Sequence, residues 1–320
     1  MKNRKRNTII SILAIAALMG FALAMTSCKK AGPKPGEPGT AGAKKIIGVS
    51  LLKENDAFYV SMKDGIIKAA KEMGYEVEVL SADNDEQKQD NNVDALLLKN
   101  ISALIICPVN SKGVSSIIAK ANAKNIPVFT ADIAAENSKV VAHIASDNYQ
   151  GGQIGAETLI KNIGKSGKVA IIQIPGTESV ASRVAGFVDT AKKNGLTIIE
   201  PYLNGKDDTQ ESERAAGSAI LSNPDLKGIF TANDNMAFGA ESAIKASGKN
   251  IILIGFNAEP AAVKKIKEDG IWKADVIQYP DKIGEKTVET IDKFFKGEIK
   301  DTGKTQFIPV EVGIVDANTK

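Results

Sequence analysis

Short apolar runs alternate with longer amphipathic stretches along most of this chain. The runs are rich in Val and Ile and nearly continuous in their apolar character, which is typical of strands covered by helices on both faces. Such alternation predicts parallel sheets with crossover helices. The strands predicted in the first half are Ile46–Leu52, Glu76–Ser81, Ala103–Cys107, Val128–Ala131 and Val140–Ser146.

The same pattern begins again in the second half of the chain. Its predicted strands are Lys168–Ile174, Thr197–Pro201, Gly228–Thr231, Ile251–Phe256 and Ala274–Ile277. An amphipathic helix over Pro280–Gly297 and a last strand over Phe307–Val315 follow. From Lys45 onward the chain exceeds the roughly 100–150 residues of a typical domain. We therefore predict an α/β protein with two doubly wound parallel-sheet lobes, in which the last strand crosses back to the other lobe.

Polar and aromatic side chains follow the predicted strands, where open parallel sheets bind their ligands. These candidate site residues are Asp56, Phe58, Tyr59, Asp132, Asn233, Asn257 and Gln278. Five of them have a structural alternative. Asp132, Asn233 and Asn257 could start turns, as Asp and Asn often do after a strand, and Phe58 and Tyr59 could pack at the start of a helix.

The N-terminus has a different pattern. Four basic residues precede an uncharged apolar run, Ile9–Met25, which leads to Thr26-Ser27-Cys28. This order predicts a secretion signal over residues 1–27, because the run is shorter than the roughly 20 residues of a membrane-spanning helix. A cysteine after small residues resembles the bacterial lipobox, so Cys28 is the predicted lipid-attachment site. Met25 stands where that motif prefers Leu, which leaves simple cleavage or an uncleaved anchor as alternatives.

A segment rich in Pro and Gly, residues 28–44, follows and is typical of a flexible tether. Removal of residues 1–27 would delete four of the 41 basic residues and none of the 38 acidic ones, leaving 37 against 38. A net charge of −1 without a cationic cluster argues against nucleic acid as a partner. If Cys28 is lipidated, Cys107 has no disulfide partner, and its apolar strand context predicts a small buried side chain.

The sequence contains no pattern typical of catalysis. His143, the single histidine, lies inside a strand pattern, which favours a structural role. No nucleophile elbow or metal-ligand cluster accompanies it, so we expect neither an enzyme nor a cofactor nor a metal site. Gly151 and Gly152 open a helix, where close packing is the preferred interpretation and anion binding the alternative.

Several segments in order resemble one family. They are Phe58–Gly65, Asn125–Val128, His143–Asn148 with Gly151 and Gly152, Asn233–Ala237 and Gly255–Asn257. From Lys45 to its end, the chain resembles the ribose-type periplasmic binding proteins of bacterial ABC importers. The resemblance implies a three-segment hinge near Asp147-Asn148, Gln278-Tyr279 and Phe307–Pro309. The N-terminal lobe would comprise residues 45–147 and 279–307, and the C-terminal lobe residues 148–278 and 308–320.

The resemblance also implies roles for individual residues. Phe58 and Tyr59 would be aromatic platforms, Asp132 a hydroxyl acceptor, Arg183 a bidentate donor, and Asn233 and Gln278 amide partners. A solvated helical position is the alternative for Arg183. The chain departs from the ribose pattern in several places: Ile133 replaces an arginine, Asn257 a carboxylate and Asp56 an amide, and the aromatic residue expected near Lys206-Asp207 is missing.

We therefore expect an extracytoplasmic solute-binding lipoprotein, anchored by lipid in the periplasm or at the cell surface. It would be a monomer that gives a monosaccharide, ribose-, galactose/glucose- or polyol-like, to an ABC permease and its ATPase. One alternative is a ligand-sensing module for chemotaxis or a histidine kinase. Another is a binding protein for a nucleoside or a furanone signal.

Overall fold

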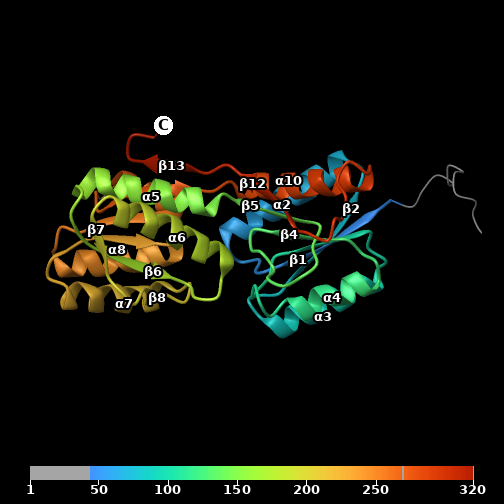
Figure 1. Ribbon diagram of the computed structural model, residues 1–320, viewed down its shortest axis with the longest axis horizontal. Helices are drawn as coiled ribbons and strands as arrows, with labels where there is room; N and C mark the ends of the chain where they lie inside the picture. The colour runs from blue at the N-terminus through green and yellow to red at the C-terminus, as the bar shows by residue number, and fades with distance from the viewer. Residues whose placement is uncertain (1–43, 269, 320) are drawn as a thin grey trace, which may run out of the picture. The chain divides into compact units, whose positions relative to one another are not determined.

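The computed structural model describes residues 44–268 and 270–319 of the 320-residue chain. The predicted signal, Cys28 and the tether as far as residue 43 lie outside the described residues. The described elements gather around two sheets, as Figure 1 shows, so the predicted α/β fold with two parallel-sheet lobes is confirmed. Within residues 44–268 and 270–319, no helix has the length and apolar character needed to cross a membrane.

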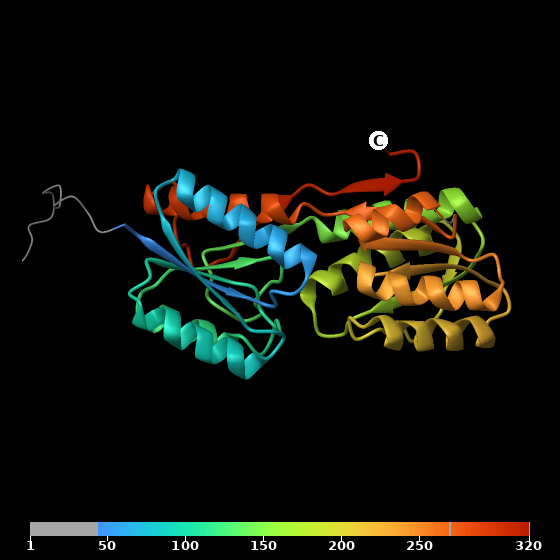
Figure 2. The same ribbon diagram turned by 180° about the vertical axis from the view of Figure 1, so that it is seen from behind.

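The first lobe is built on a six-stranded parallel sheet with the order β12-β5-β4-β3-β1-β2. Its strands are β1 (Ile46–Leu51), β2 (Glu76–Ser81), β3 (Ala103–Ile106), β4 (Val128–Ala131), β5 (Ala142–Ser146) and β12 (Gln306–Val310). Helices α2 (Ala57–Glu72) and α10 (Pro280–Phe295) cover one face, and α3 (Glu86–Leu98) and α4 (Ser115–Ala123) cover the other (Figure 2). Coverage on both faces explains why β3, β4 and β5 are buried along their whole length.

The second lobe is built on a sheet with the order β13-β11-β10-β9-β6-β7, to which β8 adds by pairing with β6. Its strands are β6 (Gly167–Gln173), β7 (Leu196–Ile198), β8 (Leu203–Asn204), β9 (Leu226–Thr231), β10 (Ile252–Asn257), β11 (Trp272–Ile277) and β13 (Gly313–Asp316). Its helices are α5 (Asn148–Ile163), α6 (Glu178–Lys193), α7 (Thr209–Ser222), α8 (Asp234–Ser247) and α9 (Pro260–Glu268). One continuous apolar core joins these helices to the sheet.

The chain passes between the two sheets three times. It leaves the first sheet after β5, returns to the first lobe after β11, and leaves again after β12. The third crossing falls between Val310 and Gly313, so the crossing predicted at Phe307–Pro309 is a few residues too early. Pro309 has no N–H for a neighbouring strand, which fits its place in β12 at the edge of the sheet.

Two further predictions about strands are corrected. The single strand predicted over Phe307–Val315 is two strands, because β12 pairs in parallel with β5 whereas β13 pairs antiparallel with β11. The second sheet is therefore mixed rather than wholly parallel. The strand predicted over Thr197–Pro201 is β7, which ends at Ile198, and the two-residue β8 that follows was not predicted.

Helices approach one another closely at paired glycines. A Cβ on Gly152 of α5 would lie 2.0 Å from the carbonyl oxygen of Arg183 on α6, and one on Gly186 of α6 would lie 2.0 Å from that of Tyr149 on α5. The prediction that Gly151 and Gly152 serve close packing is confirmed. In the first lobe, Gly65 of α2 and Gly284 of α10 make an equivalent approach.

Candidate functional site

One polar cavity lies between the carboxyl ends of the strands of the two lobes. Its volume is about 220 Å³, and its walls come from both lobes. The structure brings together at this cavity all eight residues singled out from the sequence, namely Asp56, Phe58, Tyr59, Asp132, Arg183, Asn233, Asn257 and Gln278. The carboxyl-end rule for parallel sheets explains the placement of four of them, because Asp132, Asn233 and Gln278 follow a strand within two residues and Asn257 ends one.

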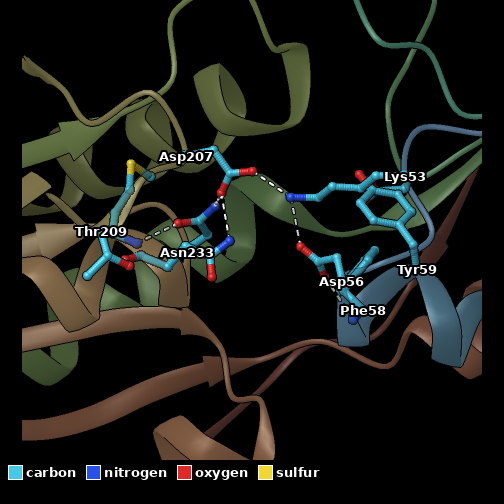
Figure 3. Close-up of polar contacts among 10 residues, drawn as sticks. Lys53, Asp56, Phe58, Tyr59, Asp207, Thr209 and Asn233 are labelled. Carbon is cyan, nitrogen blue, oxygen red and sulfur yellow. Dashed lines mark hydrogen bonds and ion pairs between the residues drawn. The ribbon is translucent and has the colours of Figure 1, made fainter. Parts of the chain in front are cut away.

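An ion pair crosses the cavity between the two lobes (Figure 3). The ammonium of Lys53, just after β1, lies 2.8 Å from Asp56 Oδ2 of its own lobe and 2.6 Å from Asp207 Oδ2 of the second lobe. Asp207 also accepts hydrogen bonds from the side-chain amides of Asn233 and Asn235. Burial acts to lower the pKa of Lys53, but Asp207 and Asp56 outweigh it, so the pKa is raised. The ammonium is therefore charged at neutral pH.

Two of the predicted residues cap helices as well as lining the cavity. Asp56 is the N-cap of α2, where its Oδ1 accepts from Phe58 N at 2.9 Å, and its Oδ2 remains for Lys53. Asn233 is the N-cap of α8, where its Oδ1 accepts from Met236 N at 3.1 Å and its amide nitrogen donates to Asp207 Oδ1. Capping therefore uses only one atom of each side chain.

Asp132 presents a carboxylate from the first lobe. Its backbone lies in the left-handed region, with φ of 66°, and its Oδ2 accepts from the Tyr59 hydroxyl at 2.8 Å. Its Oδ1 accepts no hydrogen bond from any described residue, and no backbone N–H donates to the side chain, so the turn-cap alternative does not hold. Burial raises the pKa of Asp132, whereas the positive charge of Arg183 acts to lower it.

Arg183 reaches the cavity from α6 and is only 4% exposed, so the alternative of a solvated arginine is wrong. Its Nε donates to Asn148 Oδ1 at 2.8 Å, Nη1 to the carbonyl of Ala232 at 2.7 Å, and Nη2 to Gln278 Oε1 at 3.1 Å. The guanidinium lies 4.0 Å from the ring centroid of Phe256. Burial lowers the pKa of Arg183 to about 10, which leaves it charged at neutral pH. Two of its five N–H groups have no acceptor among the described residues.

Gln278 connects Arg183 to the loop after β10. Its Nε2 donates to Asn257 Oδ1 at 2.7 Å, and its backbone N donates to the Asn257 carbonyl at 3.2 Å. Asn257 and Ala258 both have positive φ, 124° and 58°, which is unfavourable for residues with a Cβ. The loop conformation therefore needs support from its surroundings.

The two aromatic residues, Phe58 and Tyr59, take part in core packing in the first lobe and also face the cavity. Their rings meet edge to face, with centroids 5.2 Å apart. Burial raises the pKa of the Tyr59 hydroxyl well above its usual value, and Asp132 adds to this, so the group remains a hydrogen-bond donor.

Three charged residues of the cavity, Lys53, Lys206 and Asp207, were missed. Lys53 follows β1 closely and could have been found by the rule that found Asp56. Asp207 follows β8, which spans only Leu203–Asn204 and is too short to be detected from its hydrophobic pattern. Lys206 lines the cavity where the family resemblance leads one to expect an aromatic residue.

Two other singled-out residues are not among those that line the cavity. Cys107 is a buried free cysteine at the end of β3, as predicted. His143 lies in β5, where its Nδ1 is 3.0 Å from Thr130 Oγ1 and its ring stacks on Phe307. Burial lowers the pKa of His143 to about 4, so its ring is neutral at physiological pH.

Two α/β lobes that enclose a polar cavity between their strand ends are characteristic of two-lobed solute-binding proteins. The chain belongs to the family described as periplasmic binding protein domain, whose family model matches residues 47–299. The resemblance drawn from the sequence is thereby confirmed.

Similar proteins of known identity cover nearly the whole chain. The ribose import binding protein RbsB of Bacillus subtilis (strain 168) is 34% identical over 308 residues, which is 93% of this chain and 98% of that protein. An ABC transporter solute binding protein from Mycobacterium smegmatis with bound glycerol is 28% identical, with a TM-score of 0.76 over 86% of this chain and 95% of that one. Another, from Bacillus halodurans C-125 with bound myo-inositol, is 26% identical, with a TM-score of 0.77 over 87% of this chain and 96% of that one.

Proposed function

We propose that this chain is the extracytoplasmic solute-binding protein of a carbohydrate ABC importer and that it binds a neutral monosaccharide or small polyol between its lobes. The observation that carries the proposal is the cavity of about 220 Å³ to which strand ends of both lobes contribute polar side chains. The similar proteins support it, since one is a ribose import binding protein and two were solved with bound glycerol and myo-inositol.

The charges of the cavity favour a neutral ligand. Its lining carries three cationic and three anionic side chains, Lys53, Arg183, Lys206, Asp56, Asp132 and Asp207. The ammonium of Lys53 is already paired with two of the carboxylates. An anionic ligand would have to break these pairs or bring an uncompensated charge into a partly buried site, which is strongly unfavourable.

The hydrogen-bonding atoms that remain suit hydroxyl groups. Asp132 Oδ1 is an acceptor without a protein partner among the described residues, and Arg183 has two N–H donors left. A sugar hydroxyl both donates and accepts, so it can satisfy both kinds of atom at once. Phe58 and Tyr59 add apolar surface for the C–H faces of a ring.

Isothermal titration calorimetry tests the proposal. The ligand panel is D-ribose, D-glucose, D-galactose, myo-inositol, glycerol and uridine. The proteins are wild type, the cavity variant Asp132→Asn and the control Asp64→Asn, whose side chain is exposed on α2. We expect one of the neutral polyols to bind wild type and the control alike, and Asp132→Asn to bind it at least tenfold more weakly. Absence of binding for the whole panel would remove the sugar assignment, and binding of uridine alone would favour the nucleoside alternative.

The lobe assignment is part of the proposal. We infer that the lobes, residues 45–147 with 279–310 and residues 148–278 with 313–320, close on the ligand by rotation about the three crossing segments, the third of which is Glu311-Val312. Small-angle X-ray scattering should then give a smaller radius of gyration with the bound sugar than without it. An unchanged radius would argue against closure.

Anchoring and partners complete the proposal. Cys28 would carry the lipid, which would keep the protein in the periplasm or at the cell surface beside an ABC permease and its ATPase. Cys28→Ala should move the protein from the membrane fraction to the soluble fraction of cells and abolish labelling by a fatty-acid analogue. Continued labelling of that variant would contradict the assignment of Cys28.

A further inference from the structure

Two carboxyl groups lie buried beneath the loop that carries Asn257. Asp234 is the first residue of α8 and is 1% exposed, and Asp275 lies in the middle of β11 and is 0% exposed. A Cβ on Gly255 of the neighbouring β10 would come within 2.3 Å of Asp275 Oδ1. A glycine at 255 therefore makes room for the Asp275 side chain beside β10.

Each carboxyl group holds one backbone amide of the loop. Asp234 Oδ2 accepts from Glu259 N at 2.8 Å, and Asp275 Oδ2 accepts from Ala258 N at 3.1 Å. These two consecutive amides directly follow Asn257, where the backbone has the unfavourable positive φ values. The two carboxyl groups are thus the support that this loop needs.

The remaining oxygen atoms of the pair point to a shared proton. Asp234 Oδ1 and Asp275 Oδ1 are both buried and accept no hydrogen bond from a described donor. The two carboxyl groups lie close to each other, because their Oδ2 atoms accept from the consecutive backbone N–H groups of Ala258 and Glu259. Two ionised carboxylates in contact and away from water repel each other strongly, whereas one proton between them satisfies both orphaned oxygens.

The surroundings contain too little positive charge to replace that proton. The charged groups that face the pair are Glu259, on the loop itself, and Arg183, on α6. Arg183 has its own three acceptors and none of them belongs to the pair. Trp272, also in β11, contributes a neutral indole N–H that is close to Asp275.

We propose that Asp234 and Asp275 form a carboxyl–carboxylate pair that shares one proton and positions the Asn257 loop for ligand binding. The pair binds the backbone amides of Ala258 and Glu259, which fixes the neighbouring Asn257. Asn257 in turn accepts from Gln278, which accepts from Arg183. The link to binding rests on the proposed function, but the pair itself does not. Both are positioning residues, since neither lines the cavity.

The electrostatics agree with this geometry and fix the direction of the pH response. Burial raises the pKa of Asp275 from 3.8 to about 7, and burial together with Asp275 raises that of Asp234 well above 3.8. Between about pH 4 and pH 7 the unfolded chain has lost a proton that the folded protein retains. The folding equilibrium constant should therefore fall as pH rises through this window, by up to about tenfold per pH unit for the one shared proton.

The decisive variant is Asp275→Asn. Its amide oxygen can accept from Ala258 N, and its amide N–H can donate permanently to Asp234, so the pair no longer needs a proton. In urea unfolding of the protein between pH 5 and pH 9, wild type and the control Asp64→Asn should lose stability as pH rises. The stability of Asp275→Asn should change less with pH. Asp234→Asn is the reciprocal variant and should flatten the profile in the same way.

Calorimetry with D-ribose extends the test to binding. At pH values above about 7, D-ribose should bind wild type with a larger dissociation constant, and proton uptake should accompany binding. Both effects should be smaller in Asp275→Asn. A wild-type unfolding profile without this pH dependence, or equally steep profiles in wild type and both Asn variants, would overturn the shared proton. If the unfolding profiles are as expected and D-ribose does not bind, the pair is supported and only the assignment of this ligand fails.

Discussion

Replacement of Gly152 by Ala would separate the two helices that place Arg183. The new Cβ would lie 2.0 Å from the Arg183 carbonyl oxygen and 2.7 Å from Phe187 N, both of them backbone atoms that cannot rotate away. Ordinary contact begins at 3.4 Å, so α5 and α6 must move apart by about 1.4 Å at this point. Such a shift exceeds the tolerance of the hydrogen bonds that Arg183 makes at 2.7 to 3.1 Å.

The expected effect of Gly152→Ala has two parts, a loss of stability and a loss of affinity. Overpacking of a tight contact costs about 1–3 kcal/mol, of which the higher helix propensity of Ala offsets up to about 1 kcal/mol. Loss of one hydrogen bond to a charged group costs about 1.5–3 kcal/mol, or roughly 10- to 150-fold in affinity. We therefore expect Gly152→Ala to destabilise the fold modestly and to weaken ligand binding more than its distance from the cavity suggests.

Gly217→Ala is the matched control, because Gly217 lies inside α7 and an added Cβ would have no described atom of another residue within 4 Å apart from its chain neighbours and the backbone of its own helix. It should stabilise the protein by about 1 kcal/mol without changing affinity. Urea unfolding measures stability, and calorimetry with D-ribose measures affinity. If Gly152→Ala matched wild type in both measurements while the control showed its gain, the argument that this helix contact positions Arg183 would be refuted.

Two other substitutions test the cavity directly. Tyr59→Phe removes the hydroxyl donor to Asp132 and should lower the free energy of unfolding by about 1–3 kcal/mol in urea denaturation, whereas a change below 0.5 kcal/mol would show that this hydrogen bond contributes little. Lys53→Met removes the ion pair with Asp207 and should weaken ligand binding by about 1 kcal/mol, or roughly fivefold, at low salt in calorimetry. This difference should shrink at about 1 M NaCl, and a salt-independent difference would argue against an ionic contact.

The sequence predicted the fold well because the strands that form both sheets are short apolar runs at regular intervals. It failed where the pattern is too short or is shared between two sheets. β8 spans only Leu203–Asn204, and the apolar segment over Phe307–Val315 is divided between a parallel and an antiparallel pairing. Hydrophobic periodicity contains no information about which sheet a strand joins.

The cavity lining could be predicted because residues after parallel strands converge at one edge of a sheet. The partners across the cavity could not. The pairing of Lys53 with Asp207 joins residues from different lobes, and the pair of Asp234 and Asp275 joins a helix start to the middle of a strand. Such contacts depend on tertiary geometry, and a buried aspartate in a strand gives no signal in the sequence that distinguishes it from an exposed one.

The double use of Asp56 and Asn233 as helix caps has an evolutionary consequence. Asp and Asn cap helices about equally well, so an exchange between them leaves the start of α2 or α8 intact. The same exchange changes the charge or the donor that the second atom of the side chain presents to Lys53 or Asp207, and so alters the charges that surround the solute. Divergence toward new nutrients could therefore proceed at these two positions by single substitutions with little penalty in folding.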